Sequence, residues 1–254
     1  MRLKMSIKTI LNYSPNFNSK KRSLKKIKFI IFHYTGMKKE SKAINKLTKI
    51  QSEVSSHYLI KNNGEIVKMV PDLYIAWHAG ISFWKNFKSL NKNSIGIEIS
   101  NPGHDFSYKR FSQKQIKSIL ILSKFLIKKY KISKENILGH SDIAPSRKKD
   151  PGERFPWQYL SKKGVGIWHS LSGRFLKKNR MIKIDSLKEK KFLNNIFKIG
   201  FAKKKPKNIK KDKFLILLVQ AFQRRFRQEL INGKIDNECL LISENLVKKL
   251  IKFS

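Results

Sequence analysis

The sequence predicts a mixed α/β domain followed by a small helical domain. A dense apolar and β-branched run at 27–34 is typical of a strand buried on both faces. The segment 112–130 has the periodicity of a long amphipathic helix, and helical periodicity returns near the C-terminus. A chain of 254 residues with 40% hydrophobic content has enough apolar mass for one large domain, or for one domain and a smaller one.

The first elements alternate between strand and helix. The strand predicted at 27–34 follows a lysine-rich leader and carries His33 near its end. Residues 41–50 show apolar positions at helical spacing. Segments 56–61 and 65–70 flank an Asn-Asn-Gly sequence, which predicts a hairpin with a glycine-containing turn.

The middle of the chain continues the pattern. Residues 93–101 alternate, with three isoleucines on one face and Glu98 on the other, so Glu98 projects from the side opposite the isoleucines. The predicted helix at 112–130 has Ser112 as its N-cap. A short strand is predicted at 136–139. Prolines, Gly152 and clustered polar residues then predict a long irregular loop at 140–156.

A domain boundary is predicted near 175–182. Composition shifts after Trp168, and the basic stretch 174–183 reads as a connection. Three segments beyond it have helical periodicity: 187–199, 214–231 and 243–251. The predicted division is a basic N-terminal leader at 1–26, the α/β domain at 27–175 and the helical domain at 183–254.

The chain is strongly basic. It has 57 Lys and Arg against 17 Asp and Glu, a formal net charge of +40. Such a charge attracts polyanions, including nucleic acid, anionic lipid surfaces and acidic wall polymers. Alternatively, the lysines coat solvated faces because a biased genome makes Lys, Ile, Asn and Phe abundant together. Nucleic-acid binding has no support beyond charge, since no RNA-binding motif or Cys/His finger is present.

The sequence also bears on disulfide bonds, membrane spans, export and metal sites. Cys239 is the single cysteine, so no intrachain disulfide is possible. No window approaches the ~20 apolar residues of a bilayer span. We recognise no export signal, which makes the cytoplasm the default expectation. The spacing of the six histidines alone predicts no metal site, because it contains neither an HExxH nor a CxxC pairing.

Read in order, five segments resemble one family, the zinc N-acetylmuramoyl-L-alanine amidases of type 2. The resemblance spans roughly residues 27–165, and five motifs in the same order make chance agreement improbable. The motifs are FHYT at 32–35, SSHYLI and NGEI within 55–66, AWHAG at 76–80, NSIGIEISNPG at 93–103 and GHSDIAPSRKKDPGERFPW at 139–157. The resemblance implies a mixed central sheet flanked by helices, with the site in a groove.

The resemblance also implies a site. One zinc ion per chain would be held by His33, His140 and Asp150, and such a set leaves a fourth position for water, as in catalytic zinc sites. Glu98 would act as general base and Lys148 would stabilise the oxyanion. Apart from this resemblance, the sequence would predict that Glu98 is an ordinary solvated strand residue and that Lys148 is one of many lysines.

The sequence departs from some members of this superfamily at one catalytic position. Phage lysozyme-type relatives carry a catalytic tyrosine where this chain has Ser56, so a tyrosine mechanism is not expected. The implied reaction is hydrolysis of the amide between N-acetylmuramic or anhydromuramic acid and L-alanine of the stem peptide. The alternative is a noncatalytic peptidoglycan-recognition protein of the same fold, which would require the intact ligand set to be vestigial.

Trp77 and His78 are candidates for the substrate groove, since aromatic faces suit sugar rings. Tyr34, Asn93 and Arg147 are further candidates for the groove. We expect His57 to be a packed histidine or one that supports a ligand from behind.

The segment 219–250 resembles a three-helix peptidoglycan-binding domain, and the alternative is a generic helical appendage. The missing export signal favours a cytoplasmic enzyme that recycles anhydromuropeptides. A wall-binding domain favours the periplasm or cell envelope.

Overall fold

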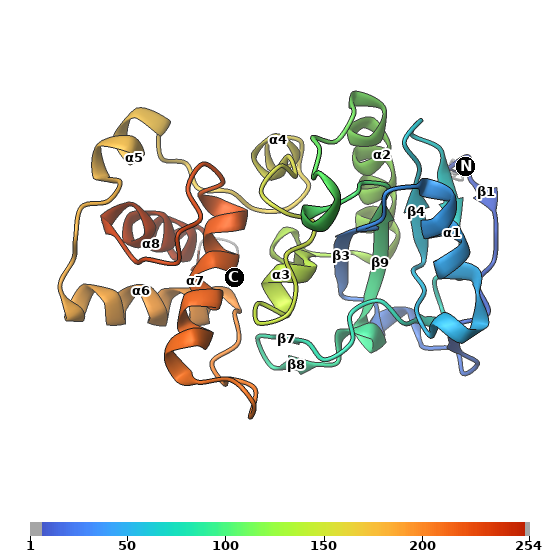
Figure 1. The fold of residues 1–254 in the computed structure, drawn as a ribbon, viewed down its shortest axis with the longest axis horizontal. Coiled ribbons are helices and arrows are strands. Elements are labelled where there is room, and N and C mark those ends of the chain that lie inside the picture. The colour runs from blue at the N-terminus through green and yellow to red at the C-terminus, as the bar shows by residue number, and fades with distance from the viewer. Residues whose placement is uncertain (1–6, 252–254) are drawn as a thin grey trace.

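The computed structural model describes residues 7–251. The first six residues of the predicted leader, and residues 252–254 of the predicted helical domain, lie outside the described residues. Figure 1 shows an α/β part around a central sheet and, beside it, a group of helices formed by the C-terminal part of the chain. Within residues 7–251, no helix combines the length and apolar character needed to cross a bilayer.

A six-stranded mixed sheet forms the centre of the α/β part. Its strand order is β1-β5-β4-β9-β3-β10, in which only the β4–β5 pair is antiparallel. The strands are β1 (Ile10–Leu11), β3 (Phe29–Tyr34), β4 (Tyr58–Ile60), β5 (Ile66–Lys68), β9 (Ser94–Ile99) and β10 (Ile137–Gly139). Two small antiparallel pairs complete the strands: β2 (Phe17–Asn18) with β6 (Ile75–Ala76), and β7 (Phe83–Trp84) with β8 (Phe87–Lys88). The predicted fold class is confirmed.

Helices flank this sheet. They are α1 (Glu40–Thr48), α2 (Gln113–Tyr130), α3 (His140–Ile143) and α4 (Trp157–Lys162), with 3-10 turns η1 (Leu24–Lys26), η2 (Ile50–Ser52), η3 (Leu90–Asn93), η4 (His104–Phe106) and η5 (Lys134–Asn136). Ser112 caps α2 by accepting the Gln115 amide at 3.2 Å, while the Gln115 side chain accepts the Ser112 amide at 3.0 Å. The buried face of α2 packs on the isoleucines of β9, as their alternation predicted.

The region predicted as a leader contributes to the fold where it is described. Strand β1 extends one edge of the sheet by pairing with β5. The buried Arg22 guanidinium donates to the carbonyl oxygens of Asp72 and Asn91, both at distances below 3.0 Å. These bonds tie residues 7–26 to the α/β part.

The three helices predicted in the C-terminal part are present, and a fourth helix precedes them. They are α5 (Gly173–Asn179), α6 (Ser186–Ile199), α7 (Lys211–Phe226) and α8 (Asn237–Ile251). Helix α5 covers 174–179 of the stretch 174–183 that we predicted as a connection, which corrects that part of the prediction. It forms because Ser172 caps it, accepting the Phe175 amide at 3.3 Å, and because Leu176 is buried in the core shared with α8.

The limits of the last two helices also differ from the prediction. Helix α7 ends at Phe226, not near residue 231, and α8 begins at Asn237, not near residue 243. The Asp236 carboxylate accepts the Cys239 amide at 3.0 Å and so caps α8 earlier than the apolar pattern indicated.

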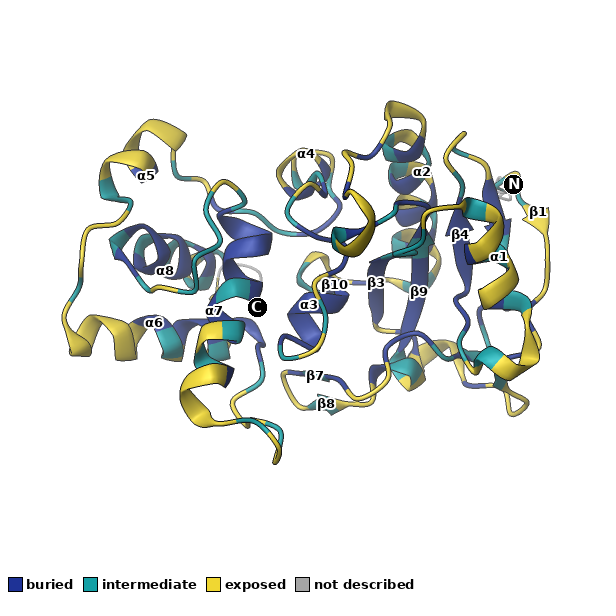
Figure 2. Cartoon of the chain, viewed as in Figure 1, coloured by how far each residue is buried: buried dark blue, intermediate teal, exposed yellow. Residues whose placement is uncertain are grey.

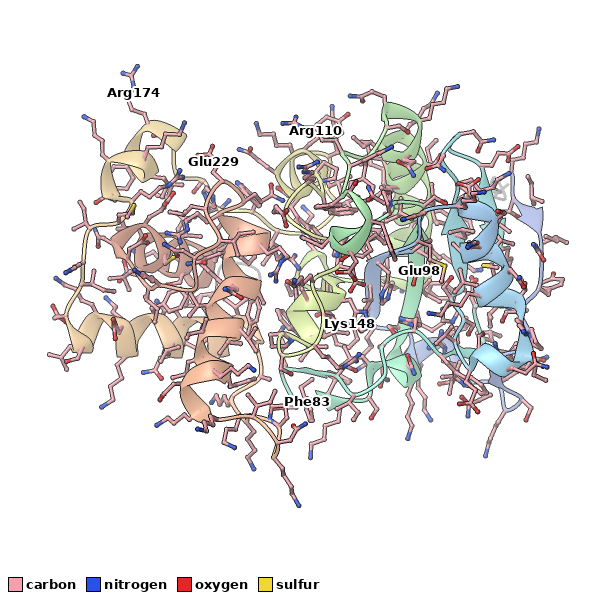
Figure 3. All side chains as sticks on the ribbon, in the orientation of Figure 1. Phe83, Glu98, Arg110, Lys148, Arg174 and Glu229 are labelled. Atoms are coloured by element: carbon pink, nitrogen blue, oxygen red, sulfur yellow. The ribbon has the colours of Figure 1, made fainter. Side chains whose placement is uncertain are left out.

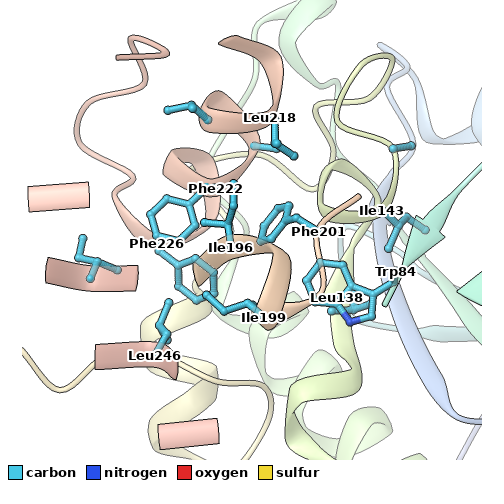
Figure 4. Packing of buried hydrophobic residues seen from close by; sticks show 14 of the residues in the cluster. Trp84, Leu138, Ile143, Ile196, Ile199, Phe201, Leu218, Phe222, Phe226 and Leu246 are labelled. Carbon is cyan, nitrogen blue, oxygen red and sulfur yellow. The ribbon is translucent and has the colours of Figure 1, made fainter. Parts of the chain in front are cut away.

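The helical part and the α/β part share one hydrophobic core. Figure 4 shows Leu138, Ile143 and Trp84 of the α/β part together with aromatic side chains of the C-terminal helices, such as Phe201 and Phe222. Figure 2 shows α3 and the facing end of α7 as buried. The C-terminal helices are therefore joined to the α/β part by a continuous apolar contact.

A buried ion pair lies within this contact. Arg225 of α7 bonds to the Asp142 carboxylate of α3, and both side chains are at most 2% exposed. Arg225 also donates to the Ile137 carbonyl at 2.9 Å and lies 4.2 Å from the centre of the Trp157 ring. The same Asp142 oxygen accepts the Gly139 amide at 2.7 Å. Arg225 therefore neutralises a carboxylate in the turn that carries His140.

We predict that Arg225→Met lowers the free energy of unfolding by about 3–5 kcal/mol, because it leaves the buried Asp142 carboxylate unpaired. Urea denaturation of the full chain measures this. Arg174→Met is the matched control, since Arg174 is exposed on α5 (Figure 3), and we expect a change within about 0.5 kcal/mol. Adding Asp142→Asn to Arg225→Met should restore part of the loss. Equal effects of the two arginine substitutions would contradict this prediction.

A second buried carboxylate, Asp72, lies against β4 and α2. Asp72 accepts hydrogen bonds from the Tyr58 hydroxyl at 2.6 Å, from the Lys129 ammonium at 2.8 Å and from the Tyr130 hydroxyl. Burial alone would raise the pKa of Asp72, but these bonds outweigh it and lower the pKa from 3.8 to about 2.

Because the folded-state pKa is lowered, Asp72 stabilises the protein above the unfolded-state pKa, and this contribution disappears as pH falls toward 2. We predict that Asp72→Asn costs about 2 kcal/mol at pH 6 and progressively less between pH 4 and pH 2. Urea denaturation of both proteins across this range measures the difference. A difference that does not change with pH would rule out the charge as its cause.

Candidate active site

A groove of about 450 Å³ opens at the carboxyl ends of the parallel strands β3, β9 and β10. In sheets of this kind, ligands bind at that edge. Its walls come from β3 and the loop after it, from α1, from the segment before β7 and from the turn after α3. The residues that bear on the chemistry are His33, Tyr34, Lys46, Trp77, His78, Glu98, Asp105, His140, Arg147, Lys148 and Asp150.

Three of the predicted residues meet at the bottom of the groove. His33 Nδ1, His140 Nδ1 and Asp150 Oδ2 lie 3.0 Å from one another in each pair, and all three residues are buried. Strand register brings the histidines together, because Phe32 pairs with Gly139 and the next residues are His33 and His140. The Ser141 amide donates to the Asp150 carbonyl at 2.8 Å and holds the loop in place.

The three facing atoms have the chemistry of metal ligands. His140 Nε2 lies 3.1 Å from the Ala79 carbonyl, which can only accept, so the proton is on Nε2 and Nδ1 presents a lone pair. Ligands at about 2.0–2.1 Å from a tetrahedral zinc ion are about 3.3 Å apart, close to the observed spacing. The residues present therefore fit a single metal ion.

Electrostatics agrees with this fit. Burial and the neighbouring His140 lower the pKa of His33 to about 4, so His33 is neutral at pH 7. Burial would raise the pKa of Asp150, yet the two neighbouring imidazoles, His140 and His33, bring it below its usual range. An ionised carboxylate beside neutral imidazole is the state in which these groups bind metals.

Glu98 lies next to this cluster. It pairs with His33 across the parallel strands, and its side chain points into the groove. Its Oε2 atom is buried without a hydrogen-bond partner among residues 7–251. Burial and the negative charge of Asp150 raise the pKa of Glu98 well above its usual value, opposed by the cations Lys148 and Lys46. A half-buried carboxyl of this kind is suited to exchange protons.

Lys148 stands on the turn after α3. Its amide donates to the Ala144 carbonyl at 3.0 Å, which fixes the backbone, and its side chain lines the groove. Glu98 and Lys148, both labelled in Figure 3, line the same groove.

Four of the five other residues predicted for the groove line it, and one does not. Tyr34, Trp77, His78 and Arg147 line the groove. Asn93 does not: its side-chain amide donates to the Lys26 carbonyl at 3.1 Å, at the end of β9 opposite the groove. The prediction for Asn93 is therefore corrected, because the alternation of strand residues gives the face of a side chain but not which end of the strand borders a cavity.

Arg147 and Tyr34 are held in place by hydrogen bonds of their side chains. Arg147 donates to the carbonyl oxygens of Ala79 and Ile81, so its guanidinium braces the segment before β7. The Tyr34 hydroxyl lies 2.8 Å from His104 Nδ1, and burial raises the pKa of Tyr34 to about 12. Tyr34 thus presents a neutral phenol as one wall of the groove.

His57 stands behind the site, within the sheet. Its Nδ1 accepts the Gly96 amide at 3.0 Å, and it does not line the groove.

Sequence reasoning missed several residues. Lys46 of α1 and Asp105 of η4 both line the groove. Lys46 could not be recognised from the sequence, because it is placed like any lysine on the polar face of an amphipathic helix. Asn91 is a third: its side-chain oxygen accepts the amides of His78 at 3.1 Å and Ala79 at 2.7 Å. No local pattern separates such an asparagine from other loop asparagines.

This geometry defines a class of protein. A buried His-His-Asp cluster able to hold one metal ion, open to a groove and flanked by a carboxyl and a lysine, is the arrangement of a hydrolytic enzyme. The particular family follows from comparison with known proteins.

A family model described as N-acetylmuramoyl-L-alanine amidase matches residues 23–153. The chain is 36% identical to the N-acetylmuramoyl-L-alanine amidase AmiD of Escherichia coli over 243 residues, covering 88% of this chain and 83% of AmiD. It is 41% identical over 113 residues to the 1,6-anhydro-N-acetylmuramyl-L-alanine amidase AmpD of Haemophilus influenzae, which covers 44% of this chain and 59% of AmpD. The chain therefore belongs to the N-acetylmuramoyl-L-alanine amidase family and is an enzyme.

Solved structures agree. E. coli AmiD in complex with anhydro-N-acetylmuramic acid-L-Ala-D-gamma-Glu-L-Lys has a TM-score of 0.76 at 34% identity and covers 88% of this chain and 90% of its own. AmpDh3 from Pseudomonas aeruginosa in complex with anhydromuramic pentapeptide has a TM-score of 0.76 at 29% identity and covers 92% of this chain and 97% of its own. The family predicted from the five motifs is confirmed.

We predict that the protein binds one divalent metal ion per chain and that Asp150→Asn weakens binding by more than the roughly 10–100-fold typical of residues behind a ligand. Equilibrium dialysis followed by elemental analysis measures both quantities. Asp105→Asn is the control, since Asp105 lines the groove outside the cluster, and it should bind metal as the unaltered protein does. Equal loss in the two variants would mean that the cluster does not hold the ion.

Proposed function

We propose that this protein hydrolyses the amide between N-acetylmuramic or anhydromuramic acid and the L-alanine of a peptidoglycan stem peptide. We further propose that its metal ion is zinc, held by His33, His140 and Asp150. The observation that carries the proposal is the set of three facing acceptor atoms 3.0 Å apart beside Glu98, in a chain of this family. The anhydromuramyl class of substrate is taken from the names of its relatives.

Bound there, a zinc ion would supply Lewis acidity toward a water molecule and the substrate carbonyl. Glu98 accepts the proton that the water loses as its oxygen bonds to the carbonyl carbon. A carboxyl whose pKa is raised by burial then returns that proton to the leaving nitrogen. The carbon–nitrogen bond breaks, which leaves a muramic acid carboxyl group and the free amine of L-alanine.

Lys148 has a separate role. Its positive charge acts to lower the pKa of Glu98, and it stands on a turn fixed by a backbone hydrogen bond. We assign to it the stabilisation of the negative charge that develops on the carbonyl oxygen. This role needs a fixed cation that does not give up its proton.

The helical part enters the proposal as a peptidoglycan-binding domain. Its resemblance over 219–250 supports this. The match to AmiD covers 88% of the chain and so extends into the helical part. A wall-binding role predicts a preference for intact sacculi and an envelope location. A preference for free anhydromuropeptides favours recycling in the cytoplasm.

We predict that Glu98→Gln lowers kcat by roughly 10²–10⁴-fold and that Lys148→Met lowers it by roughly 10²–10³-fold, with bound metal unchanged. Mass spectrometry of products from purified anhydromuropeptides and from sacculi measures cleavage. The control is Glu65→Gln, an exposed carboxylate of the β5 region, which should retain full activity.

Release of L-alanine-headed peptide from either substrate, lost on chelation and in Glu98→Gln, is the expected result. Metal-loaded protein that binds wall material but cleaves neither substrate would overturn the proposal and favour a noncatalytic recognition protein.

A further inference from the structure

The imidazole ring of His78 lies directly behind His33. His78 Nδ1 is 3.0 Å from His33 Nε2, and the two rings meet nearly at right angles, with centroids 5.1 Å apart. Since His33 directs its Nδ1 toward His140 and Asp150, the His78 contact occupies its other nitrogen. His78 therefore touches the side of His33 that faces away from the metal cluster.

A chain of hydrogen bonds determines which nitrogens carry protons. The Leu90 carbonyl can only accept, so Ser94 donates its hydroxyl proton to it at 2.7 Å. The Ser94 oxygen then accepts from His78 Nε2 at 3.2 Å, which places the single proton of neutral His78 on Nε2. His78 Nδ1 must accept, and His33 Nε2 must donate to it. His33 Nδ1 is thereby left with a free lone pair.

The same segment of chain orients the second histidine. The Ala79 carbonyl accepts the proton of His140 Nε2 at 3.1 Å, so two consecutive residues provide the outer acceptors for both histidines. Asn91 fixes this segment, because its side-chain oxygen accepts both the His78 and the Ala79 amide. The segment is thus held by bonds that do not involve the cluster itself.

Strand β9 leaves room for this arrangement. A Cβ atom on Gly96 would lie 2.4 Å from His78 Cγ, well inside van der Waals contact. Glycine in the interior of a strand weakens it and marks a place where another group approaches closely. The group that approaches Gly96 is the His78 ring.

We propose that His78 is a positioning residue for the metal centre, which holds His33 in the tautomer protonated on Nε2 so that Nδ1 is available to the ion. This inference rests on the metal site of the proposed function. Groups that hydrogen-bond to a metal-binding histidine fix its tautomer and orientation, and their loss typically costs 10–100-fold in metal affinity. His78 acts through His33 and has no direct part in the reaction.

Two substitutions separate this role from simple packing. His78→Leu removes the acceptor, whereas His78→Asn places an amide oxygen near the position of Nδ1. In the full-length protein, competition with a chelator should give a zinc affinity about 10–100-fold weaker for His78→Leu and within a few fold of the unaltered protein for His78→Asn. His169→Leu, which removes a buried histidine outside the groove, is the control and should retain zinc affinity. A folded His78→Leu protein with unchanged zinc affinity would overturn the proposal.

A second measurement does not depend on metal. In the metal-free protein at pH 8, the ¹⁵N shifts of the His33 ring should show a protonated Nε2 and an unprotonated Nδ1. Ser94→Ala, which removes only the far end of the hydrogen-bond chain, should allow the other tautomer to appear. A His33 ring protonated on Nδ1 in the unaltered protein would contradict the assignment. If His33 has the expected tautomer but the protein binds no zinc, the proposed function fails and the role of His78 as acceptor stands.

Discussion

The register of β3 between its two parallel neighbours is the constraint on which the site depends. On one side β3 pairs His33 with Glu98, and on the other it pairs Phe32 with Gly139, so that His140 follows beside His33. A shift of one residue in either pairing would turn one of these side chains to the opposite face of the sheet. The isoleucines of β9 prevent such a shift, because their burial against α2 fixes which face of the strand is apolar.

Much of the fold was predictable from local chemistry. The strand at 27–34, the hairpin around Asn-Asn-Gly and the capped helix at 112–130 each carry a signal within a few residues, and the structure has all three. The alternation at 93–101 also predicted that Glu98 and the isoleucines face opposite ways, as they do. The convergence of His33, His140 and Asp150 is different, since spacing gave no metal site and only the resemblance of five motifs brought the three residues together.

What the sequence could not provide are contacts between distant residues. Helix α5 was missed because its stability comes from Leu176 packing in the core shared with α8, and not from its basic sequence. Asn93 was assigned to the groove although it lies just before β9, at the end of that strand away from the groove. Arg225 has no local pattern that sets it apart from other cations, and it is buried against Asp142, which is 83 residues away in the sequence. In each case the deciding partner lies outside the window in which a pattern can be read.

The ion pair between Asp142 and Arg225 joins two residues that the ribosome synthesises at different times. A ribosome delivers the whole α/β part before it delivers Arg225, so the nascent chain holds the turn of His140 without the cation that neutralises its buried carboxylate. Domains generally fold as units during synthesis, the N-terminal one first, but here the first unit lacks its final charge balance until α7 has emerged. The turn of His140 therefore reaches its final charge balance only when α7 has emerged, and a chain truncated before α7 would lack Arg225.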